Sequence, residues 1–156
     1  MTEARRVATT ATSQTSCFID EHISRFSNYQ NLLRITALCY RYFANLKSPR
    51  LNRLIAIPLK TEELRQTELT IIRLVQQNAF PAEWKVLQRG QTVFNKSPLR
   101  WFHPIIGQDN VIRIGGRLGQ SELSYDQKHK IILPKSHVLS ILIIRTYHER
   151  LLHAAP

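Results

Sequence analysis

Apolar residues recur at helical spacing in the segment that follows Ser27. The pattern predicts a helix over 28–46, capped by Ser27 and ended by Ser48-Pro49. Its expected buried face consists of Leu32, Ile35, Thr36, Cys39 and Phe43. On that face we interpret Cys39 as a small buried apolar residue and not as a reactive thiol.

Two more helices follow in the same pattern. Thr61 caps the first of them, because two acidic residues come directly after it and suit the positive end of the helix dipole. Its expected buried face consists of Leu64, Ile71, Val75 and Ala79. The next helix, over 82–88, is opened by Pro81 and ended by Gly90. We expect these helices to form one helical packing unit.

The pattern changes after residue 95. Asp109-Asn110 predicts a turn, and the apolar segment 111–114 behind it predicts a short strand. A second strand is expected over 130–133, closed by Pro134. We expect the two strands to pair across the polar connection 117–129.

The last predicted element is a helix from His137 to about Leu151, capped by Ser136. It is strongly apolar, so it must pack against something. The whole pattern predicts an α+β fold that is mostly helical. Along the 156 residues we expect a disordered or extended lead over 1–24, a helical connector over 25–95, and a strand pair with a C-terminal helix over 96–156.

Charge adds a class of partner to this picture. Lys and Arg number 22 against 11 Asp and Glu, and this net charge of +11 favours polyanions such as nucleic acid. The candidate nucleic-acid-binding residues are Arg113, Arg117, Lys128, Lys130 and Lys135. The alternative is an ordinary solvated surface. Trp101-Phe102 is expected to anchor a core and not to stack on bases.

Cysteine usage and hydropathy indicate the cellular compartment in which the chain is expected. The two cysteines, Cys17 and Cys39, form no C-x-x-C pair, so we expect a reducing, intracellular compartment, cytoplasm or nucleus. No apolar run approaches the roughly 20 residues that span a bilayer, and no membrane partner is expected. The segment 1–16 lacks the apolar centre of a secretory signal, whereas its composition leaves a mitochondrial presequence open.

No arrangement of residues indicates catalysis. The acidic residues form no spaced pair at a strand end, and no G-x-S-x-G elbow occurs. Gly115-Gly116, between Arg113 and Arg117, matches neither nucleotide-binding glycine motif. A close backbone approach to a phosphate is one interpretation of these glycines, and a glycine bulge at the end of a strand is the one we favour. We expect a chain that is not an enzyme.

His148 and His153 form a candidate metal pair. Each helical residue turns by about 100°, so five steps place the two rings about 140° apart on a continuous helix. They would share a metal only if the helix ended near Leu151 and the chain turned back. A structural zinc site takes four donors, and two imidazoles supply half of that set. The alternative is two ordinary histidines at a helix end.

Several segments, taken in order, resemble the polyproteins of BEL/Pao-type LTR retrotransposons. They are RFSNY (25–29), LRITA (33–37), LKTEEL (59–64), AFP (79–81), IRIGGRL (112–118), KHKIILP (128–134) and YHERLLHA (147–154). Each motif is modest, and the ordered series is the specific part. The similar stretch lies after the ribonuclease H region and runs into the zinc-binding domain of the integrase.

The resemblance implies a role for the histidines. In that family two histidines and two downstream cysteines hold zinc in a small helical module, and His148 and His153 fall on the histidine positions. The C-x2-C pair and the acidic catalytic core would lie beyond Pro156, and Ala155 replaces a common glycine. The resemblance thus implies a non-catalytic polyprotein fragment with a truncated zinc module, associated with DNA integration and nucleic-acid binding. Zinc belongs to the full-length module and is not expected in this chain.

Two other functions stay open from the sequence. The apolar last helix suits a protein-interaction or self-association module without a nucleic-acid role, through Val138, Ile141, Leu142 and Ile144. A metal-dependent enzyme that uses His148 and His153 is the third possibility.

Overall fold

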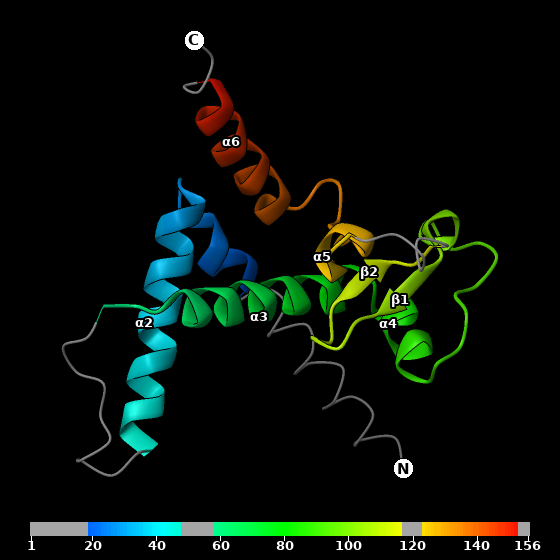
Figure 1. The fold of residues 1–156 in the computed structure, drawn as a ribbon, viewed down its shortest axis with the longest axis horizontal. Coiled ribbons are helices and arrows are strands. Elements are labelled where there is room, and N and C mark those ends of the chain that lie inside the picture. The colour runs from blue at the N-terminus through cyan, green and yellow to red at the C-terminus, as the bar shows by residue number, and fades with distance from the viewer. Residues whose placement is uncertain (1–18, 48–57, 117–122, 153–156) are drawn as a thin grey trace. The chain divides into compact units, whose positions relative to one another are not determined.

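The computed structural model describes residues 19–47, 58–116 and 123–152, as Figure 1 shows. The chain divides into two compact units. Unit 1 combines residues 1–71 with 136–156, and unit 2 is the continuous segment 72–135. The fold is mostly helical with one small antiparallel sheet, which confirms the α+β class. No helix in the described ranges is long and apolar enough to cross a membrane.

Unit 1 is helical. It contains α2 (Tyr29–Lys47), the first part of α3 (Thr61–Ala79) and α6 (Val138–Leu152). The backbone N–H of Tyr29 donates to Thr146 Oγ1 at 3.4 Å, so α2 begins against α6. The Tyr29 hydroxyl donates to Glu68 on α3 at 2.6 Å, and burial raises its pKa above the ordinary tyrosine value, with the Glu68 carboxylate adding to the shift. Tyr29 thus joins three helices, through its backbone N–H and its hydroxyl.

The predicted helices have the expected extents, but the caps differ. The cap expected at Thr61 lies at Lys60, whose carbonyl accepts the N–H of Leu64 at 3.2 Å, and two other caps lie one residue further along than predicted. The side-chain oxygen of Asn28, and not the hydroxyl of Ser27, accepts the first free N–H groups of α2, that of Gln30 at 2.8 Å. Nδ1 of His137, and not Ser136, accepts the N–H of Leu139 at the start of α6, at 3.0 Å. Asparagine and imidazole side chains accept such bonds as well as serine does, so composition alone does not choose between adjacent positions.

Of the buried face predicted for α2, only Leu32 and Thr36 are buried. Ile35 is 45% exposed, Cys39 is exposed and Phe43 is 59% exposed. The prediction that Cys39 is buried is therefore wrong. The second half of α2 faces α3 with another side, on which Arg41 pairs with Glu63, and periodicity does not show which side of a helix a neighbour covers.

Unit 2 contains the end of α3 and all the strands. Its other elements are α4 (Pro81–Gln88), the 3-10 turn η2 (Arg100–Phe102), β1 (Pro104–Ile106), β2 (Ile112–Ile114) and α5 (Tyr125–Lys128). Its core consists of Trp84, Leu87, Leu99, Ile112 and Ile132. Gly90, with φ at +69°, ends α4 as predicted, because glycine adopts this left-handed conformation without strain.

The strand pairing differs from the prediction. β2 pairs with β1, in a register that sets Pro104 opposite Ile114, across the predicted turn at Asp109-Asn110. The segment expected to be the partner, 130–133, makes a single bridge, Arg113 with Ile131. The short turn explains this outcome, since closing a few residues costs less entropy than closing the longer connection.

The predicted division at 95/96 does not coincide with the compact units. α4 and the hairpin share one core in unit 2, although the prediction separates them. α6, expected to belong with the strands, is part of unit 1. Of the disordered or extended lead predicted over 1–24, residues 19–24 are described. They are helical and Ile23 is buried, so the prediction is wrong for this part.

Candidate nucleic-acid interface

Arg113, a predicted nucleic-acid-binding residue, is buried. Its side chain is 2% exposed, and Nη2 lies 2.5 Å from Oδ2 of Asp109. Nη1 lies 3.0 Å from Oδ1 of Asp126 and donates to the carbonyl of His129 at 2.7 Å. The Tyr125 ring covers the guanidinium, 5.2 Å from Cζ. Arg113 thus joins the hairpin to α5 and presents no charge on the surface.

Two carboxylates stabilise the positive charge of the buried Arg113 guanidinium. Burial lowers the pKa of Arg113, but the hydrogen bond to Asp109 and the charges of Asp109 and Asp126 outweigh it, so the pKa stays above the ordinary value. Arg113 in turn occupies both acids on its side of unit 2. The Asp109 side chain is largely buried beside it, whereas the Asp126 side chain is 54% exposed and keeps its charge at the surface.

The lysines of the prediction lie on unit 2. Lys130 and Lys135 are exposed and Lys128 is partly buried, whereas Arg117 lies outside the described residues. The carbonyl of Lys130 accepts the N–H of Ile114 at 2.8 Å, so the backbone that carries these lysines is fastened to β2. In sequence, residues 72–135 hold ten Lys and Arg against four Asp and Glu. In sequence this segment therefore carries an excess of positive charge.

Gln76, on α3, supports this arrangement from inside. It is fully buried, and its amide nitrogen donates to the carbonyls of Ile112 and Ile132, at 2.9 and 2.6 Å. Its amide oxygen accepts the N–H of Ile112 at 2.7 Å. Sequence reasoning missed this residue, because a glutamine among polar helix positions carries no signal of burial.

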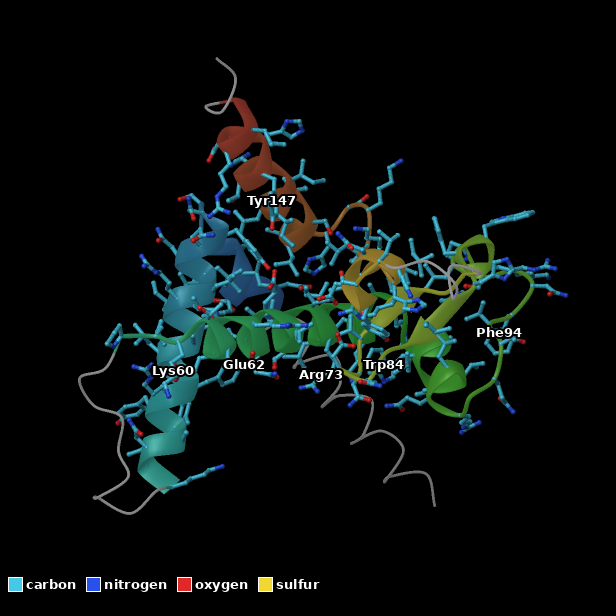
Figure 2. All side chains as sticks on the ribbon, in the orientation of Figure 1. Lys60, Glu62, Arg73, Trp84, Phe94 and Tyr147 are labelled. Carbon is cyan, nitrogen blue, oxygen red and sulfur yellow. The ribbon has the colours of Figure 1, made fainter. Side chains whose placement is uncertain are left out.

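An exposed aromatic corner lies on the segment 94–103. Trp101 is 84% exposed, Phe94 57% and Phe102 46%, and Figure 2 labels Phe94 on the loop between α4 and η2. The prediction that Trp101-Phe102 anchors a core is therefore wrong. Leu99, 4% exposed, fills that place and turns its neighbours outward.

Gly115 allows a close backbone contact inside the hairpin, and we assign it no role in binding phosphate. Its N–H donates to the carbonyl of His103 at 3.0 Å. A Cβ at this position would lie 2.2 Å from that same oxygen, so only glycine allows this approach. Gly116 is exposed, with open space where its Cβ would be.

Only one residue of the predicted metal pair, His148, is among the described residues. His148 is exposed on α6, which continues as a helix to Leu152, and His153 lies outside the described residues. Within the described ranges no three His, Cys, Asp or Glu side chains come together in a group that could hold a metal ion. One imidazole does not make a zinc site, so we derive no zinc chemistry from these residues.

Unit 1 holds one charged pair beside a hollow. Arg41 donates to both carboxylate oxygens of Glu63, Nε at 2.9 Å and Nη2 at 2.5 Å. The hydrogen bond from Arg41, followed by the one from the N–H of Lys60, lowers the pKa of Glu63 to about 2. The adjacent hollow of about 380 Å³ lies between α2 and α3. This pair is a structural link at the start of α3.

Comparisons with known protein families, curated proteins and solved structures found no match.

Proposed function

We propose that this chain is a non-catalytic, nucleic-acid-binding segment related to the integrase N-terminal region of BEL/Pao-type retrotransposon polyproteins. The resemblance of the ordered motifs supports the relationship. The excess of Lys and Arg over Asp and Glu in residues 72–135 supports the binding of nucleic acid. Its contacts are electrostatic and independent of base sequence, because lysine side chains on a surface recognise phosphates and not base edges.

The supporting observation is the excess of cations over acids among the described residues of unit 2. Arg113 is paired with Asp109 and Asp126 and adds no charge at the surface, whereas the Asp126 side chain stays 54% exposed. The remaining described acid of unit 2, Glu83, accepts a hydrogen bond from Ser97 Oγ at 2.8 Å. The described acids are thus engaged in side-chain contacts, while Lys130 and Lys135 face solvent.

The salt dependence of binding tests this proposal. We expect the affinity for a DNA duplex to fall steeply with salt, by about 0.9 in log K per unit of log salt concentration for each phosphate neutralised. Replacing Lys128, Lys130 and Lys135 with glutamine should lower this slope by about one unit per lysine that contacts a phosphate. Lys47→Gln, on the exposed end of α2, is the control. Affinity that does not change between low and moderate salt contradicts the proposal.

A second candidate function is a protein-interaction module. α6 exposes Ile141, Ile144 and Leu151 along one side, at 51%, 55% and 69%. The end of α2 exposes Tyr42 and Phe43 in the same way. Sedimentation after nuclease treatment separates the two functions. A stable oligomer that survives nuclease favours the interaction module, and a monomer argues against self-association.

A further inference from the structure

We propose that the aromatic corner of unit 2, formed by Phe94, Trp101 and Phe102, is a stacking platform for the bases of single-stranded nucleic acid. This inference deepens the proposed function by naming the form of nucleic acid that unit 2 binds. It rests on the exposure of the rings, on the way the backbone is fastened beneath them, and on the charge around them.

The rings are exposed although the chain around them is held in place. Leu99 is buried in the core, and its N–H donates to Ser97 Oγ at 3.2 Å. Ser97 in turn donates to Glu83 on α4 at 2.8 Å. At the other end, His103 is joined to Gly115 by a backbone hydrogen bond. The segment is therefore attached on both sides of η2, and the outward direction of Trp101 belongs to the fold.

The surroundings match a polyanion. Residues 84–108 contain no Asp or Glu at all, and they carry the cations Lys85, Arg89, Lys96 and Arg100. Lys96 and Arg100 are exposed and lie between Phe94 and Trp101 in the sequence. Interleaved cations and aromatic rings are the arrangement by which proteins hold single strands, since the cations follow the phosphates and the rings stack on the bases.

The platform selects single strands for a geometric reason. In a duplex the faces of the bases are covered by their neighbours, whereas unpaired bases can be splayed out and stacked on an aromatic ring. Trp101 reaches such a base without any rearrangement, because its ring is already exposed. A duplex would gain only the contacts of the lysines.

Anisotropy titrations with the full chain test this inference. The probes are a labelled oligothymidylate strand and a duplex of the same length. We expect Trp101→Ala to weaken single-strand binding by about 5- to 150-fold, the range for the loss of one stacked base, and to leave duplex binding unchanged. Trp101→Tyr should restore most of the affinity. Tyr42→Ala, which removes an exposed ring of unit 1, is the matched control and should have no effect.

Tryptophan fluorescence gives a second measurement. Oligothymidylate should quench the emission of the natural chain, and should not quench Trp101→Ala, in which only the buried Trp84 remains. Salt-dependent binding that Trp101→Ala leaves unchanged overturns the platform but not the proposed function. Failure to bind either probe overturns both. Quenching by phosphatidylserine vesicles and not by the oligonucleotide overturns the platform in favour of a lipid surface.

Discussion

Buried polar side chains decide the structure of unit 2 at the scale of single residues. Gln76 satisfies the N–H of Ile112 and the carbonyl groups of Ile112 and Ile132, and Arg113 satisfies the carbonyl of His129 together with two carboxylates. Such groups contribute little when paired, but their partners become costly when they are removed. The stability of unit 2 therefore depends on these two positions.

Replacing Gln76 with leucine should lower the free energy of unfolding by at least about 2 kcal/mol, because it leaves backbone groups of Ile112 and Ile132 buried without a partner. Urea unfolding followed by circular dichroism measures the change. Gln77→Leu, at the next and only partly buried position, is the control. Equal effects of the two substitutions would contradict the role of Gln76.

Glu63 should make stability depend on acid pH. Its folded pKa of about 2 lies below the ordinary value near 4.3, so the stabilisation is complete above the ordinary value and is lost as the pH falls towards 2. Glu63→Gln should be less stable than the natural chain at pH 6, and the difference should shrink by pH 3. Urea unfolding at both pH values measures it, with Glu62→Gln as a control for charge in the same helical turn. A difference that stays constant with pH would refute this assignment.

At the scale of elements, local signals and packing answer different questions. Periodicity predicts α2, α3, α4 and α6, because the spacing of apolar residues on a helix depends only on neighbours along the chain. It does not predict the exposure of Phe43, nor the pairing of β2 with β1. Nothing in Pro104–Ile106 distinguishes a strand from a loop until Ile112 lies beside it.

The hairpin should depend on Gly115 and not on Gly116. Gly115→Ala places a methyl group against the carbonyl of His103, and we expect it to cost about 1–3 kcal/mol, as overpacking does. Gly116→Ala meets nothing within 4 Å and should change stability little. Thermal unfolding of the two variants compares them directly. If Gly116→Ala proved the more harmful, the close contact at Gly115 would not be the cause.

At the scale of the whole molecule, the two units differ in how the chain builds them. Unit 1 joins residues from both ends of the sequence, whereas unit 2 is one continuous segment with its own core. A continuous segment with its own core is the usual form of an independently folding domain. The candidate interface, both the lysines and the aromatic corner, lies within this segment.

A fragment over 60–135 should therefore fold by itself. It keeps α3 whole, so Gln76 retains its place against the strands. We expect a single cooperative thermal transition and dispersed amide signals in a nitrogen–proton NMR spectrum. A broad transition with collapsed signals would show that unit 2 depends on unit 1.

The sequence by itself determined the helices α2, α3, α4 and α6, the turn at Asp109-Asn110 and the excess of positive charge, because each depends on residue type and near spacing alone. Tertiary structure decided which charged side chains and which aromatic rings are exposed to solvent. Arg113 became an internal cation because Asp109, Asp126 and the His129 carbonyl converge on it from separate segments. Trp101 became exposed because Leu99 took the place in the core. Both outcomes depend on contacts between distant residues, which no local pattern encodes.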